Sequence, residues 1–144
     1  MFKETSKELL DFLSKSPTAF HAVENYRQIL NADGFKELLE SEHWDIVPGG
    51  KYYVTRNNTS ILAFKVGTKL DNYSFNIVTS HTDSPTFKVK ENAEIEVKNK
   101  YTQLNTEGYG GMLCATWLDR PLSIAGRVLV SEGISIVTKL LNID

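Results

Sequence analysis

The strongest constraint on the fold of this chain is a change of sequence pattern at Pro48-Gly49-Gly50. Before this point, apolar residues recur every three or four positions, which is the period of an amphipathic α-helix. After it, runs rich in β-branched and aromatic residues alternate with turn residues, which is typical of strands. The sequence therefore predicts an α/β chain in which helices come first and a β-rich half follows.

Three helices are expected before the change of pattern. Thr5 and Glu8 have the spacing of a capping box, which places the start of a first helix at Thr5. Pro17 suits the first position of a second helix, because its missing N–H would be unpaired there anyway. Gly34 is a stop signal for that second helix. A third, short helix is expected over Phe35–Glu42.

The β-rich half shows two kinds of strand pattern. Continuous apolar runs indicate buried strands, whereas alternation of apolar and charged residues indicates half-exposed antiparallel strands. The predicted elements are strands at 51–56 and 60–66 around an Asn57-Asn58 turn, a buried strand at 73–80, alternating strands within 87–97, a tight turn at 108–111 and a hairpin over 124–137.

Composition excludes several classes of function. The chain has 144 residues, with 16 Lys+Arg against 18 Asp+Glu, so its net charge of −2 argues against binding to nucleic acid or to an anionic membrane. No apolar run approaches the length of a membrane span, and the first residues are too polar for a signal peptide. The single cysteine, Cys114, permits no internal disulfide. A cytoplasmic location is therefore expected.

His81 and Asp83 are the first candidates for chemistry. They follow the apolar run at 73–80, and loops that leave strand ends commonly carry functional groups. Positions i and i+2 of an extended backbone face the same side, so the carboxylate can lie beside the imidazole. The pair by itself leaves two interpretations open. It fits a metal site whose ligand is oriented by a carboxylate, and it fits a loop histidine with a turn-forming aspartate.

Other reactive residues have simpler interpretations. His21 lies on the second helix and His43 near a helix end, and neither is assigned a function. Cys114 is expected to behave as a small buried apolar residue. Asp119 beside Arg120 fits either a substrate clamp or a structural ion pair, of which the ion pair is favoured.

Four blocks of sequence occur in order along nearly the whole chain. They are SPTAFHAV at 16–23, TSHTDSP at 79–85, YGG at 109–111 and TWLDRPLSIAGRV at 116–128, of which the last is long enough to be specific. Together these blocks resemble the M18 family of metalloaminopeptidases, also known as the aspartyl aminopeptidase family.

The resemblance implies a cytoplasmic zinc enzyme that removes N-terminal, often acidic, residues from peptides at a two-metal centre. His81 matches a zinc ligand, and Asp83 matches the catalytic acidic group that supports the metal site. Residues 1–86 would form the N-terminal part of the catalytic domain, with helices and the start of a zinc-peptidase-type mixed sheet. Residues 87–144 would begin a β-rich dimerisation insert, so the intact enzyme is expected to be a homo-oligomer.

The chain departs from the family in length. The remaining acidic ligands, the adjacent glutamate pair and two further histidines have no counterpart in its 144 residues. A catalytic zinc needs about three protein ligands and an open position for water. We therefore expect the isolated chain to be inactive. The alternative is a non-catalytic remnant that self-associates or assembles with full-length subunits.

Overall fold

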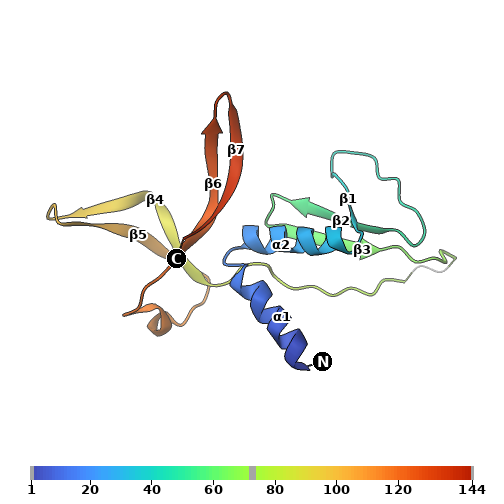
Figure 1. The fold of residues 1–144 in the computed structure, drawn as a ribbon, viewed down its shortest axis with the longest axis horizontal. Coiled ribbons are helices and arrows are strands. Elements are labelled where there is room, and N and C mark those ends of the chain that lie inside the picture. Colours follow the sequence, from blue (N-terminus) through green and yellow to red (C-terminus); the bar gives the residue numbers. More distant parts are fainter. Residues whose placement is uncertain (1, 72–73, 144) are drawn as a thin grey trace. The chain divides into compact units, whose positions relative to one another are not determined.

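The computed structural model describes residues 2–71 and 74–143. The described residues form an α/β chain that divides into two units, one of residues 1–82 with 123–144 and one of residues 83–122 (Figure 1). The elements are α1 Phe2–Ser14, α2 Ala19–Ala32, β1 Lys36–Glu37, β2 Lys51–Arg56, β3 Ser60–Lys65, β4 Thr86–Val97, β5 Tyr101–Tyr109, the 3-10 helix η1 Cys114–Trp117, β6 Ile124–Glu132 and β7 Ser135–Ile143. The prediction of helices followed by a β-rich half is confirmed.

Helix α1 begins before the predicted capping box. It starts at Phe2, so Thr5 lies inside the helix and not at its N-cap. The hydroxyl of Ser6 donates to the Phe2 carbonyl at 2.8 Å, one turn back, as expected of a serine within a helix. Phe12 attaches this helix to α2, because its ring lies 4.6 Å from the ring of Tyr26.

Helix α2 is capped by Thr18. The Thr18 hydroxyl accepts a hydrogen bond from the His21 N–H at 3.4 Å, so helix residues begin at Ala19 and Pro17 precedes the cap instead of occupying the first helical position. Gly34 has a φ of +79°, a conformation that glycine adopts without steric cost, and it follows the helix end as predicted.

The first unit contains a three-stranded mixed sheet. Strand β1 pairs in parallel with β2, and β2 pairs antiparallel with β3. The short helix predicted over Phe35–Glu42 is wrong, because Lys36–Glu37 forms β1 and the Leu38 N–H donates to the Tyr53 carbonyl at 2.8 Å. Pairing with β2 therefore overrides the weak local helix preference of this short segment.

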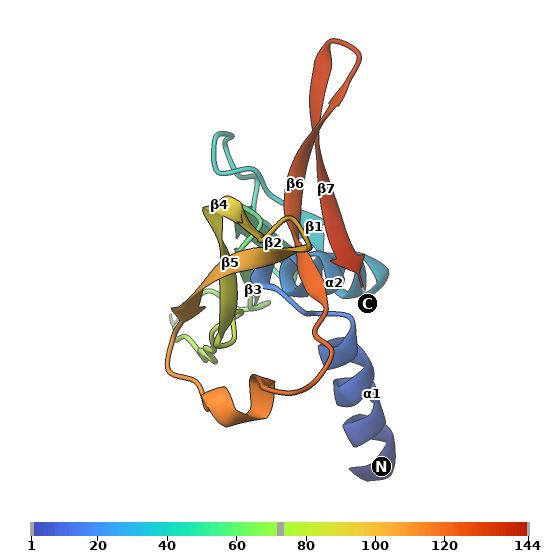
Figure 2. The same cartoon turned by 90° about the vertical axis from the view of Figure 1, so that its left-hand side faces the viewer.

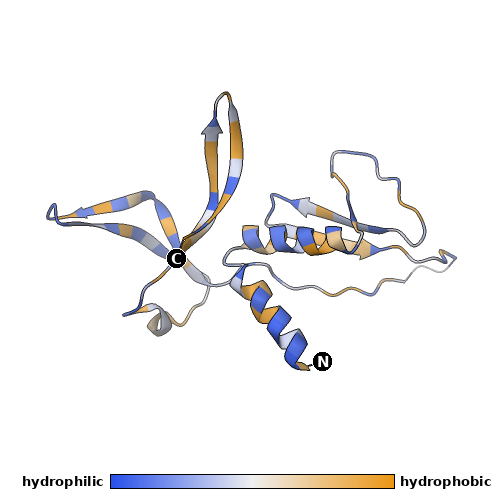
Figure 3. Cartoon of the chain, in the orientation of Figure 1, coloured by the Kyte–Doolittle hydropathy of each residue, from blue (hydrophilic) through white to orange (hydrophobic). Residues whose placement is uncertain are grey.

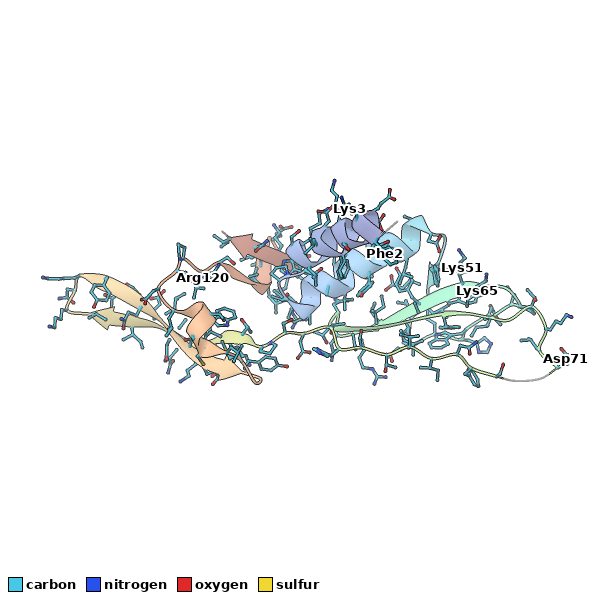
Figure 4. All side chains as sticks on the ribbon, turned by 90° about the horizontal axis from the view of Figure 1, so that it is seen from below. Phe2, Lys3, Lys51, Lys65, Asp71 and Arg120 are labelled. Atoms are coloured by element: carbon cyan, nitrogen blue, oxygen red, sulfur yellow. The ribbon has the colours of Figure 1, made fainter. Side chains whose placement is uncertain are left out.

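The hairpin of β2 and β3 confirms the predicted turn. Asn57 and Asn58 have φ values of +53° and +55°, a conformation that asparagine tolerates, and together with Thr59 they form the three-residue connection between the strands. The hairpin register runs from Lys51 opposite Lys65, both labelled in Figure 4, to Arg56 opposite Ser60.

The core of the described residues lies between α2 and this sheet. Helix α2 lies against the sheet, as Figures 1 and 2 show. Tyr53 joins the two layers because its hydroxyl donates to Asn31 of α2 at 3.0 Å and to Glu37 of β1 at 3.3 Å. Arg27 of α2 also contacts Glu37, at 2.9 Å. The buried apolar residues that the structure describes are Ala22, Val23, Tyr52 and Tyr53.

The buried strand predicted at 73–80 is not formed in the part that the structure describes. Residues 74–80 are extended and belong to no sheet, and Tyr73 lies outside the described residues. Phe75, Ile77 and Val78 are 82%, 76% and 98% exposed. A strand with a continuous apolar run is stable when other elements cover both of its faces. The described part of the chain does not cover residues 74–80 in this way.

The second unit is built on the antiparallel hairpin of β4 and β5. Its register runs from Thr86 opposite Tyr109 to Val97 opposite Tyr101, with an irregularity between Val89 and Glu94. The predicted alternation within 87–97 thus corresponds to one bulged strand. At the base of the hairpin, the ring of Phe87 packs edge-on against Trp117 of η1 at 5.4 Å.

Strands β6 and β7 form a hairpin that belongs to the first unit. It extends to Ile143, beyond the predicted end at 137. Arg127 of β6 lies 4.4 Å from the ring centre of Phe20 in α2, a cation–π contact that joins the hairpin to the helix. Figure 3 shows that much of both strands is hydrophobic. Leu129, Ile134 and Ile136 of this hairpin are exposed.

Within residues 2–71 and 74–143, every helix is too short or too polar to span a membrane.

Candidate functional site

His81 ends the extended segment that follows the mixed sheet. The next residue fixes this end, because the Thr82 hydroxyl donates to the Thr59 carbonyl in the β2–β3 turn at 2.6 Å. The His81 side chain is exposed. The sheet hairpin thus holds the backbone next to the candidate ligand while the imidazole remains accessible.

Asp83 begins the second unit and is held from strand β5. The Tyr109 hydroxyl donates to Oδ2 of Asp83 at 2.6 Å. This distance is typical of a hydroxyl bound to an ionised carboxylate. The hydrogen bond and the negative charge of Asp83 raise the pKa of the Tyr109 hydroxyl above its usual value.

The register of the β4–β5 hairpin explains how these two residues meet. Tyr109 pairs with Thr86, the first residue of β4, so residues 83–85 leave the ladder beside the end of β5. Gly110 follows with a φ of +74°, and a Cβ there would lie 3.6 Å from Pro85. The HTDSP and YGG blocks, 24 or more positions apart, are therefore in contact through residues 83–85 and 109–110.

The other predicted candidates lie elsewhere and are not brought together. The Nδ1 atom of His21 lies 2.8 Å from the Thr18 hydroxyl in the α2 cap. His43 lies 3.7 Å from Asp45 on the surface.

Two expectations about the segment around η1 are wrong. Cys114 is exposed, because η1 presents it to solvent in this unit. Asp119 has a φ of +54°, and no ion pair joins it to Arg120 in the described part of the chain. This geometry supports neither the ion pair nor the substrate clamp that the sequence suggested for Asp119 and Arg120.

Tyr109 is the site residue that sequence reasoning missed. The YGG block was interpreted as a tight turn, and the tyrosine was given no role. A signal was present, because Tyr109 directly precedes two glycines in one of the blocks that match the family.

The described residues do not complete a zinc site. Within residues 2–71 and 74–143, no group of three His, Cys, Asp or Glu side chains is arranged to hold a metal ion. Zinc in a catalytic site needs about three protein ligands. The donor set of the described residues therefore does not fit a whole zinc site.

A shallow hollow in the second unit lies at the irregularity of β4. It is lined by side chains of both charges, among them Lys88, Lys90, Glu91 and Glu107. Neither His81 nor Asp83 lines it, and we assign it no function.

Comparison with known proteins identifies the family of this chain. The profile of the aminopeptidase I zinc metalloproteases (M18) matches residues 12–144. The chain belongs to the M18 family.

Similar proteins are considerably longer than this chain. The probable M18 family aminopeptidase 2 of Clostridium novyi is 50% identical over 143 residues, which cover 96% of this chain and 33% of that protein. The aspartyl aminopeptidase of Dictyostelium discoideum is 46% identical over 129 residues, which cover 89% of this chain and 26% of that protein. The chain thus spans about a third of the curated relatives it matches.

A solved structure of the family shows the same fold. The mApe1 dodecamer of Saccharomyces cerevisiae superimposes with a TM-score of 0.84 at 31% identity, covering 98% of this chain and 34% of that one. The α/β arrangement of two helices, a mixed sheet and antiparallel hairpins is therefore the arrangement found in a family member.

Proposed function

We propose that this chain is the N-terminal portion of a zinc aminopeptidase that releases N-terminal, often acidic, residues from peptides. The observation that carries the proposal is the match of residues 12–144 to the M18 family. The name of the Dictyostelium relative, aspartyl aminopeptidase, supports the preference for acidic residues. A cytoplasmic location and a homo-oligomer belong to the same proposal, and the dodecameric yeast neighbour supports the oligomer.

Within this proposal His81 supplies one zinc ligand and Asp83 is the catalytic acidic group that orients its surroundings. The exposed imidazole at the end of a fixed segment supports the first role. The hydrogen-bonded, oriented carboxylate supports the second. Residues 1–86 form part of the catalytic domain, and residues 87–144 begin the dimerisation insert.

The remaining ligands of a two-metal centre come from a longer protein, and the 144 residues alone are inactive. The lack of a three-ligand cluster in the described residues supports this statement. The exposed apolar side chains of 74–80 support it too, because neighbouring strands of a larger sheet would bury them.

The test is a hybrid in which residues 1–144 replace the matching segment of the Clostridium novyi relative. We expect the hybrid with zinc to cleave aspartyl and glutamyl p-nitroanilides, and the isolated chain to show no turnover. A folded hybrid without aminopeptidase activity contradicts the proposed function. Turnover by the pure 144-residue chain contradicts its inactivity.

His81→Ala tests the ligand assignment in the same hybrid. We expect a loss of at least about 100-fold in activity, because the removal of outer-shell partners alone costs 10–100-fold. His43→Ala is the matched control, since this histidine side chain is 90% exposed and distant in sequence from the candidate site. Equal activity of both variants would refute the assignment of His81.

A second candidate function is a non-catalytic chain that assembles with itself or with full-length subunits. The exposed apolar residues of the β6–β7 hairpin favour it, because open strand edges and apolar side chains promote association. Co-elution of the chain with the full-length Clostridium relative in gel filtration supports this candidate. Separate elution of the two, with the chain as a monomer, contradicts it.

A further inference from the structure

The hydrogen bond between Tyr109 and Asp83 links two sequence blocks whose relation is not evident from the sequence. Asp83 lies two residues after the candidate ligand His81, on a segment outside any strand. Tyr109 is the last residue of β5, where the paired strand β4 fixes its backbone. A side chain on a rigid element thus reaches a carboxylate on a loop.

The backbone on both sides of this contact is constrained. The ring of Pro85 fixes its own φ angle. Gly110 lies beside Pro85, and a Cβ atom added at Gly110 would lie 3.6 Å from it. Phe87, which lies in β4 two residues after Pro85, packs against the ring of Trp117. The Tyr109 hydroxyl, whose oxygen lies 2.6 Å from Oδ2 of Asp83, restricts the rotation of the Asp83 side chain.

The hydrogen bond contributes little to stability. Tyr109 is 46% exposed, so both groups can exchange their bond for bonds to water. The orientation of a catalytic carboxylate has a larger effect on the reaction rate, because a displacement of about 1 Å in a reacting group can cost about 100-fold. The effect of the contact is therefore expected in catalysis and not in folding.

We propose that Tyr109 is a positioning residue that orients the Asp83 carboxylate for the aminopeptidase reaction. This inference rests on the proposed function, because it assigns Asp83 to that reaction. Tyr109 acts through Asp83, because it donates a hydrogen bond to Oδ2 of that carboxylate from the end of β5.

The test uses the hybrid described above with Tyr109→Phe, which removes the hydroxyl and keeps the ring. We expect kcat to fall about tenfold with KM within about twofold, as for an interaction that acts on the reacting groups and not on substrate binding. Tyr101→Phe is the matched control, because it removes a hydroxyl from the other end of β5, at a residue that is 56% exposed. It should leave kcat unchanged.

A double-mutant cycle separates positioning from a general structural effect. In the Asp83→Asn background, Tyr109→Phe should reduce kcat by less than about threefold, since two residues that act as a unit are not additive. Equal losses in both backgrounds, or a Tyr109→Phe loss no larger than that of Tyr101→Phe, overturn the proposal while the proposed function stands. An inactive, folded parent hybrid overturns both.

The contact itself is measured in the 144-residue chain by NMR of ¹³Cζ-labelled tyrosine. The Asp83→Asn change should lower the pKa of Tyr109 toward its ordinary value, because the charged acceptor is lost. An unchanged pKa at Tyr109 means that the hydrogen bond is absent, and it overturns the proposal.

Discussion

Tyr53 does more to join helix and sheet than its apolar ring suggests. The residue is 1% exposed, and its hydroxyl donates to both Asn31 and Glu37. The sequence placed Tyr53 in a strand, but the partners of its hydroxyl depend on where α2 lies. Buried polar contacts of this kind depend on tertiary packing and are not visible in hydrophobic periodicity.

Tyr53→Phe should therefore destabilise the chain although the ring is retained. Loss of the hydroxyl removes its hydrogen bonds to Asn31 and Glu37, whereas Arg27 still contacts Glu37, so we expect a cost of about 1 kcal/mol in the free energy of unfolding. Urea denaturation followed by circular dichroism measures the change. The exposed Tyr101→Phe serves as its control and should change stability by less than about 0.5 kcal/mol. Equal stability of the two variants would show that the Tyr53 hydroxyl is not a structural contact.

His21 makes the α2 cap sensitive to pH. Burial lowers the pKa of His21 from its ordinary value of 6.5, so the unfolded chain takes up a proton at a higher pH than the folded chain does. In the neutral ring, Nδ1 can accept a hydrogen bond from the Thr18 hydroxyl, whereas in the protonated ring it cannot. A positive charge at a helix N-terminus is also unfavourable.

The expected result is a loss of stability on acidification. The contribution of His21 is fully present above about pH 6.5 and is lost as the pH falls from 6.5 through the lowered folded-state pKa. His21→Gln should flatten this part of the curve of unfolding free energy against pH, and His43→Gln should not. A pH dependence unchanged by His21→Gln would contradict the account of the cap.

Two hairpin turns show how far local sequence determines an element. Asn57-Asn58 was predicted as a turn because asparagine tolerates positive φ, and the structure confirms it. The β4–β5 turn uses Lys98 and Asn99, at φ values of +51° and +53°, and was not singled out. Lysine carries no turn signal, so here strand pairing imposes a conformation that the local sequence does not favour.

Substitutions at Asn58 should change stability in opposite directions. Asn58→Gly should raise the free energy of unfolding slightly, because glycine adopts positive φ without steric cost. Asn58→Ala should lower it by about 1 kcal/mol, since alanine pays for the left-handed conformation. Thermal unfolding of both variants checks the sign, and stabilisation by alanine would exclude this turn geometry.

For the chain as a whole, the sequence predicted helices followed by a β-rich half, the end of α2 at Gly34, the β2–β3 hairpin and the family. It could not predict that residues 74–80 lie outside any sheet, because their pattern describes a strand with neighbours that the described residues do not provide. It also could not predict the Asp83–Tyr109 contact, which depends on the register of β4 with β5. Both gaps have the same cause, namely that contacts distant in sequence leave no local pattern.

We propose that this chain carries one zinc ligand, His81, and not a zinc site. Equilibrium dialysis against micromolar zinc, with the metal counted by mass spectrometry, tests it most directly. The 144-residue chain should retain well below one zinc per chain, with no change in His81→Ala, whereas the hybrid with the Clostridium relative should retain about two and lose metal in His81→Ala. Retention of one full equivalent by the isolated chain, abolished by His81→Ala, would contradict the claim.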